Sequence, residues 1–118
     1  MERKILSVSY DESLLVTRQL ILQQDGYQVT SALGFIEALR RCKEGGFDLA
    51  IVGHSIPRSD KRVLLEEIHK SCRAPVLSLY KSSEGSLPGA DYAMDAMDGP
   101  QALLEMVHKV LDSSAATR

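Results

Sequence analysis

The sequence of 118 residues has little net charge, only two cysteines and no long apolar run. A net charge of -2 gives no electrostatic reason for binding to nucleic acid or to an anionic membrane surface. No apolar stretch approaches the roughly 20 residues that a membrane-spanning helix needs. The first residues contain neither the apolar segment nor the small-residue cleavage site of a signal peptide. We therefore expect a single cytoplasmic domain that binds neither nucleic acid nor membrane.

The two cysteines, Cys42 and Cys72, fall on different predicted helices and lack the paired spacing of a metal or redox motif. The histidines are also scattered and show no zinc-ligand spacing. We expect both cysteines to be reduced residues with a structural role, and we predict no metal and no cofactor.

Short β-rich runs alternate along the chain with segments of helical periodicity. The expected strands are residues 4–9, 27–32, 48–52, 75–80 and, more weakly, 91–95. The clearest helix repeats apolar residues at positions i, i+3, i+4 and i+7, namely Phe35, Ala38, Leu39 and Cys42. Strands that alternate with helices at this spacing predict a parallel sheet covered by helices on both faces.

One connection breaks this alternation, between the fourth and fifth expected strands. It consists of 81-KSSEGSLPGA-90, which is too short and too rich in helix breakers for more than about a turn of helix. We therefore expect the fourth helix to be shortened or missing. The predicted domain spans residues 1–112, and we expect residues 113–118 to be a disordered tail or the start of a linker.

The chain resembles the receiver domain of response regulators, the chemotaxis-regulator-like proteins of two-component systems, over residues 4–111. The resemblance rests on the strand FDLAIV with Pro57 in the loop beyond it, the phrase APVLSL, and the phrase GADY before the fifth strand. It implies a flavodoxin-like, doubly wound sheet of five parallel strands in the order 2-1-3-4-5. It also implies phosphorelay signal transduction, in which a histidine kinase transfers a phosphoryl group to an aspartate.

This sequence differs from the family at every position of the phosphorylation site. Two acidic residues should follow the first strand and bind Mg²⁺, but Ser9 and Tyr10 stand there. The aspartate that accepts the phosphoryl group should end the third strand, where this chain has Gly53. The serine or threonine of the fourth strand and the lysine of the fifth are replaced by Tyr80 and Ala96. The resemblance thus implies a degenerate site that has lost three carboxylates and one ammonium together.

Those losses are mutually consistent, because a single charge left at the site would lack its partner. Without the metal and the lysine, nothing offsets the charge that develops on a transferring phosphoryl group. We therefore predict a pseudo-receiver that is not an enzyme, is not phosphorylated, and acts through protein–protein contact. Its expected partners are signalling proteins or an effector domain, and a homodimer stays open.

Two other functions stay open at this point: a conventional phosphorelay receiver with an unrecognised acceptor, and a small-molecule-binding module. Tyr10 and Tyr80 map to the rim of the degenerate site, so we expect their rings to fill it or to line a small-molecule pocket. His54 follows Gly53, and strand alternation predicts that His54 faces away from the site toward solvent. Asp11 is expected to cap the first helix rather than to bind a metal.

Overall fold

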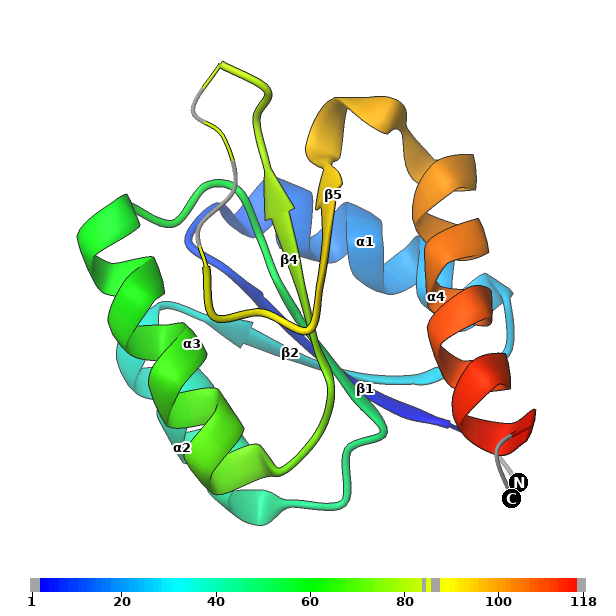
Figure 1. Cartoon of the computed structure of the whole chain (residues 1–118), viewed down its shortest axis with the longest axis horizontal. Helices are drawn as coiled ribbons and strands as arrows, with labels where there is room; N and C mark the ends of the chain where they lie inside the picture. Colours follow the sequence, from blue (N-terminus) through cyan, green and yellow to red (C-terminus); the bar gives the residue numbers. More distant parts are fainter. Residues whose placement is uncertain (1–2, 84, 86–87, 117–118) are drawn as a thin grey trace.

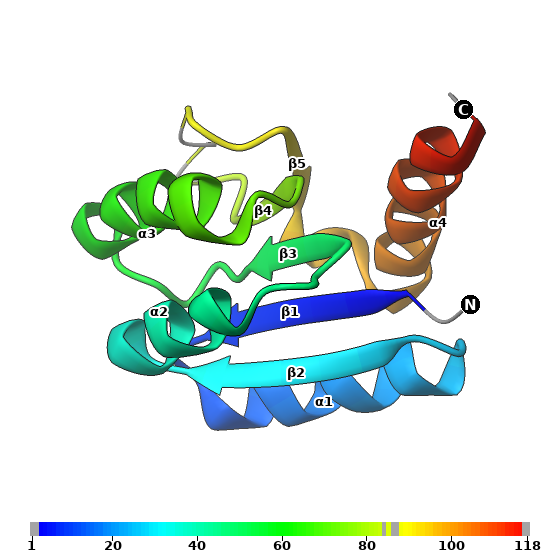
Figure 2. The ribbon, with the colours of Figure 1, turned by 90° about the horizontal axis from the view of Figure 1, so that it is seen from below.

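The computed structural model describes residues 3–83, 85 and 88–116, which form a five-stranded sheet with helices on both faces (Figures 1 and 2). All strands are parallel and follow the order β2-β1-β3-β4-β5. The strands are β1 (Lys4–Ser9), β2 (Gln28–Leu33), β3 (Leu49–Val52), β4 (Val76–Tyr80) and β5 (Tyr92–Asp95). The helices are α1 (Glu12–Gln24), α2 (Phe35–Glu44), α3 (Arg58–Cys72) and α4 (Pro100–Ala116), with a 3₁₀ helix at Ala96–Asp98. The predicted doubly wound fold is therefore confirmed.

Alternate residues of the central strands supply the cores on the two faces of the sheet. In β3, Leu49 and Ile51 belong to the core shared with α4, whereas Ala50 and Val52 belong to the core shared with α2 and α3. This division follows from the two-residue period of a strand. Because both faces are covered, every residue of β3 is apolar and buried.

Helix α1 begins where the sequence predicts. The Asp11 side chain accepts a hydrogen bond from the Leu14 amide at 3.1 Å, so Asp11 is the N-cap and its carboxylate is used in that role. The chain leaves the helix through Gly26, whose φ of 93° lies in the region that favours glycine. The cap and the glycine together explain why the helix spans these residues.

The connection between β4 and β5 contains no helix among its described residues, as predicted. It instead runs against α3, since a Cβ built at Gly89 would lie 3.7 Å from the Leu65 Cβ. Strand β5 is last in the sheet order and so is an edge strand, and Tyr92 at its start is 39% exposed.

Helix α4 ends later than the domain boundary expected at residue 112. It continues to Ala116 and so extends into the segment 113–118, which was expected to be a disordered tail or the start of a linker. Residues 117 and 118 lie outside the described residues. In the part of the chain that the structure describes, no helix combines the length and the apolar character needed to cross a membrane.

The cysteines also differ from expectation. Cys42 of α2 and Cys72 at the end of α3 form a disulfide, with sulfur atoms 2.10 Å apart and Cα atoms 5.0 Å apart. The prediction of two reduced cysteines was wrong, because sequence spacing does not show that α2 and α3 lie side by side (Figure 1). The bond joins the two helices that cover one face of the sheet.

Candidate functional site

The residues at the predicted site positions gather at the carboxyl ends of the strands. Ser9 ends β1 and Tyr10 follows it, Gly53 follows β3, Tyr80 ends β4, and Ala96 follows β5. Ligands of doubly wound sheets bind at this edge. The structure therefore brings these positions together, and their surroundings decide what they can do.

Hydroxyl groups join the β1–α1 loop to the β3–α3 loop, where the family resemblance places acidic residues. The Ser9 and Ser55 Oγ atoms lie 3.0 Å apart, and the Tyr10 amide donates to the Ser55 Oγ at 3.1 Å. The Asp11 amide donates to the Ser9 Oγ at 3.0 Å. Among the described residues, no three metal-ligating side chains cluster here or elsewhere.

The space above Gly53 is occupied by the guanidinium of Arg18, which enters from α1. A Cβ at residue 53 would lie 2.9 Å from Arg18 Nη2 and 3.1 Å from the Val8 carbonyl oxygen. Real Cβ atoms rarely approach other atoms so closely, so a side chain at residue 53 requires Arg18 to move. Gly53 is not among the glycines with a positive φ, so a side chain at residue 53 is limited by the space beside Arg18 rather than by the backbone conformation.

Arg18 is a buried cation without a carboxylate partner. Arg18 is 6% exposed. Its Nη1 atom donates hydrogen bonds to the Ser7 Oγ at 3.1 Å and to the Val8 carbonyl oxygen at 3.3 Å. None of the ion pairs between described residues includes it. Burial lowers the pKa of Arg18 to about 10. The side chain still carries its charge near neutral pH, so a desolvated positive charge stands at the position of the family's acceptor.

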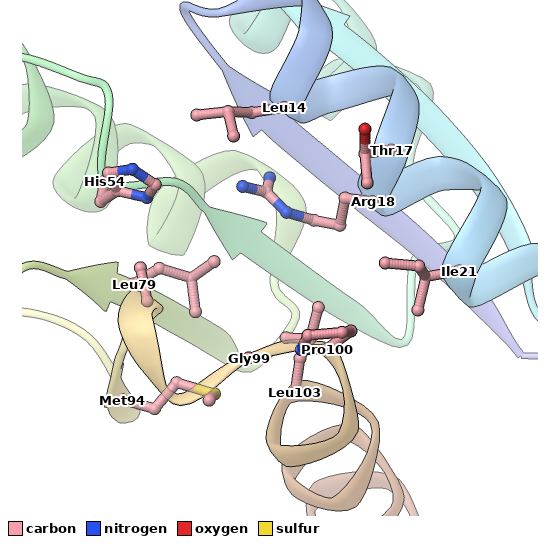
Figure 3. Close-up of a pocket in the computed structure, with 11 residues that line it drawn as sticks. Leu14, Thr17, Arg18, Ile21, His54, Leu79, Met94, Gly99, Pro100 and Leu103 are labelled. Atoms are coloured by element: carbon pink, nitrogen blue, oxygen red, sulfur yellow. The ribbon is translucent and has the colours of Figure 1, made fainter.

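A cavity of about 220 Å³ opens beside Arg18, between α1, the ends of β4 and β5, and the start of α4 (Figure 3). Its wall is largely apolar and includes Leu14, Leu79, Met94 and Leu103. Ala96, at the position of the family's lysine, belongs to the same wall. Where the resemblance implies a lysine, the short side chain of Ala96 therefore leaves space in the cavity wall.

A second buried cation, Lys61, reaches the same edge of the sheet from α3. Lys61 is 5% exposed, and its ammonium donates to the carbonyl oxygen of Leu79 near the end of β4. It lines a smaller cavity together with Tyr80, Arg58 and Lys81. Cations therefore reach this edge of the sheet from α1 and α3, whereas Ala96 after β5 supplies none.

Tyr10 and Tyr80 are not the side chains nearest the space above Gly53. Tyr10 packs against the α2–α3 core, and its hydroxyl donates to Asp60 at 3.0 Å. Burial, together with the bond to this carboxylate, raises the pKa of Tyr10 to about 12. Tyr80 lines the smaller cavity.

Strand alternation predicted that His54 faces solvent, and the structure differs from this prediction. His54 is partly buried and borders both cavities. The prediction was wrong because β3 ends at Val52, so the two-residue alternation of a strand no longer applies to residue 54.

Sequence reasoning missed Arg18 and Lys61. Arg18 stands between Leu15 and Leu22 in the buried stripe of α1, at spacing i, i+3 and i+7. Lys61 occupies a similar place on α3, four residues before the buried Leu65. A charged residue at a buried position of an amphipathic helix is the signal that could have identified both.

Comparison with solved structures identifies the architecture. A response regulator receiver domain protein from Methanospirillum hungatei has a TM-score of 0.86 and 26% identity, with 100% of each chain covered. The response regulator TrrA from Thermotoga maritima, in complex with Mg²⁺-BeF, has a TM-score of 0.80 and 26% identity over 92% of this chain and 99% of that one. The chain has the receiver-domain fold. No protein-family model and no curated protein sequence matches it.

The receiver-domain fold also appears in a solved complex between the histidine kinase ThkA and TrrA. The match has a TM-score of 0.79 and 24% identity, and it covers 92% of this chain and 98% of that chain. The family resemblance implies an acceptor aspartate at the end of β3. This chain has Gly53 at that place, beneath the guanidinium of Arg18.

Proposed function

We propose that this chain is a pseudo-receiver, a receiver-like domain of signal transduction that is not phosphorylated and acts through contact with other proteins. The observation that carries the proposal is the guanidinium of Arg18 above Gly53. Glycine supplies no nucleophile, and the arginine takes the space that an acceptor side chain would need. The proposed domain is not an enzyme.

The Mg²⁺ that the family's chemistry uses does not fit the residues at this edge. Mg²⁺ is usually bound through one or two carboxylates together with phosphate oxygens, and Ser9 and Tyr10 supply none. The buried charge of Arg18 would in addition repel a divalent cation next to Gly53. No phosphotransfer step is therefore assigned to this site.

The proposed partners are signalling proteins or an effector domain, in the cytoplasm. The receiver-domain fold supports this, as does the solved complex of TrrA with a histidine kinase. Without phosphorylation as a switch, a partner changes the state of the domain only through different affinities for its conformations. A homodimer is a second form of the same proposal, measurable by light scattering.

The test is incubation with acetyl phosphate and Mg²⁺, followed by intact-mass measurement. A receiver domain that carries the acceptor aspartate serves as the positive control in the same buffer. We expect the control to gain one phosphoryl group and this chain to gain none. A stable gain by this chain would refute the proposal, and peptide mapping would then identify the acceptor that the sequence conceals.

A further inference from the structure

Arg18 has hydrogen-bonding capacity that the described residues do not use. A guanidinium carries five N–H donors, and both hydrogen bonds of Arg18 start from Nη1. The described residues provide no acceptor for Nη2 or Nε. Buried charged groups are almost always paired, because an isolated charge in an apolar environment is costly. An anion that binds from outside the chain would supply the missing partner.

The guanidinium points into the cavity between α1 and the start of α4. Figure 3 shows it extending from α1 toward His54, with Leu14 on one side and Leu79 on the other. An anion placed there would meet the guanidinium directly and would have the imidazole of His54 opposite.

The rest of the cavity wall determines what kind of anion fits. Apart from Arg18, Thr17 and His54, the wall consists of apolar side chains and the backbone around Gly99. A phosphate or sulfate ion would lose its hydration against this wall, with the one buried arginine to offset two negative charges. A hydrocarbon body gains free energy from the same burial. One cation in an apolar cavity therefore matches a single negative charge on an apolar molecule.

The size of the cavity limits the ligand further. Its volume of about 220 Å³ is the volume that about seven molecules of liquid water occupy. A ligand on the order of ten non-hydrogen atoms fits this space.

We propose that this cavity binds a small monocarboxylate, with its carboxylate on Arg18 and its aliphatic or aromatic body among Leu79, Met94 and Leu103. Arginine forms paired, charge-assisted hydrogen bonds to carboxylates, which gives the site both affinity and orientation. The ligand would contact α1, the ends of β4 and β5, and the first turn of α4 at once. This proposal does not depend on whether the chain is phosphorylated.

The first experiment compares matched probes on the wild-type chain by thermal unfolding and calorimetry. Benzoate and 4-methylpentanoate are the carboxylates, benzamide and 4-methylpentanamide their neutral analogues, and acetate and phosphate the anions without an apolar body. We expect the two carboxylates to raise the Tm with concentration. The amides should bind about 10-fold more weakly or worse, because hydrogen bonds to charged groups are the stronger ones.

Three results of this comparison would overturn the proposal. The first is that neither benzoate nor 4-methylpentanoate binds at about 10 mM. Another is equal binding of the amides, which would remove the role of the charge. The third is equal binding of phosphate or acetate, which would remove the role of the apolar body.

Methyl NMR of the methionines locates the ligand without any substitution. Met94 lies in the cavity wall, whereas Met106 of α4 does not line the cavity. We expect benzoate to shift the Met94 methyl signal and to leave the Met106 signal in place. Equal shifts at both methionines, or no shift at Met94 despite binding, would place the ligand elsewhere and contradict the proposal.

Substitutions then test the role of Arg18. Arg18→Met removes the charge and keeps much of the length, and Arg40→Met is the matched control on α2, where the Arg40 side chain is 70% exposed. We expect Arg18→Met to weaken carboxylate binding about 10- to 100-fold and Arg40→Met to leave it unchanged. Unchanged affinity in Arg18→Met would refute the assignment. Should Arg18→Met not fold, Ala96→Leu, which adds volume to the cavity wall and keeps Arg18, must abolish binding.

Discussion

The two faces of the sheet bury their side chains in different ways. On the α2–α3 face, one apolar cluster extends from Leu6 to Val76, and the disulfide joins the two helices that cover it. The α1–α4 face also has an apolar cluster, but it leaves a cavity of about 220 Å³ at the carboxyl ends of the strands. Protein interiors are normally closely packed, so a cavity around a buried charge lowers stability. Incomplete packing occurs here at the edge where doubly wound sheets bind ligands.

The two buried cations show the same contrast. Lys61, on the α2–α3 face, donates to the Leu79 carbonyl, so its charge is used to satisfy a backbone group. Arg18, on the α1–α4 face, uses one nitrogen and leaves two without an acceptor among the described residues. The first cation satisfies a backbone group, whereas the second keeps donors that the described residues do not use.

The largest expected effect comes from the matched pair Leu64→Ala and Leu103→Ala. Leu64 of α3 is 0% exposed within the closely packed face, and Leu103 of α4 is 7% exposed and lines the cavity. Leu64→Ala should lower the free energy of unfolding by about 3–5 kcal/mol, and Leu103→Ala by about 2–3 kcal/mol, because Leu103 has fewer contacts to lose. Urea unfolding of the two variants measures the difference. Equal losses would mean that the two faces are packed alike.

The next prediction is that removing the two buried cations changes the free energy of unfolding in opposite directions. Lys61→Met should lower the free energy of unfolding by about 1–3 kcal/mol, because the buried Leu79 carbonyl loses a donor. Arg18→Met should raise it by about 1 kcal/mol, because a desolvated charge is replaced by a shorter, apolar side chain. Denaturant unfolding of both variants beside the wild type is the measurement. A loss of stability in Arg18→Met would show that its two hydrogen bonds outweigh its desolvation.

A smaller effect is expected when a side chain is added at residue 53, which tests whether Arg18 occupies the space above Gly53. Gly53→Ala should cost about 1–2 kcal/mol, because the added Cβ would lie 2.9 Å from Arg18 Nη2. The same substitution in an Arg18→Met background should cost less, since the shorter side chain frees the space. A double-mutant cycle measures the coupling. Strict additivity of the two substitutions would contradict a direct contact.

The smallest effect concerns Tyr10, on the closely packed face. Its pKa is raised from 10.0 to about 12, first by burial and then by the bond to Asp60. The folded protein therefore keeps the hydroxyl proton that the unfolded chain loses above pH 10. The contribution of Tyr10 to stability should be complete below about pH 10 and disappear as the pH rises to about 12.

Ultraviolet titration of the wild type and Tyr10→Phe checks this directly. The wild type should show one tyrosine that ionises near pH 12, and the variant should lack it. Retention of that late ionisation in Tyr10→Phe would assign it to another tyrosine.

Much of the fold was predictable because its signals are local. The apolar run of β3, the Asp11 cap and the breakers between β4 and β5 are each contained in a few consecutive residues. The location of Ser9, Gly53 and Tyr80 at the carboxyl ends of the strands was also predictable, since strand ends can be located in the sequence. The disulfide and the orientation of His54 were not, because they depend on how α2 approaches α3 and on where β3 ends.

The alternation of strands and helices and the absence of a carboxylate at residue 53 can be seen in the sequence alone, since periodicity and residue identity do not depend on which residues meet after folding. Which side chain lies above Gly53 depends on the tertiary structure. Arg18 and Gly53 are far apart along the chain, and they meet because β1 pairs with β3 and the Arg18 side chain reaches from α1 to the end of β3. This contact depends on the direction of the Arg18 side chain in the folded protein, which cannot be predicted from neighbouring residues in the sequence.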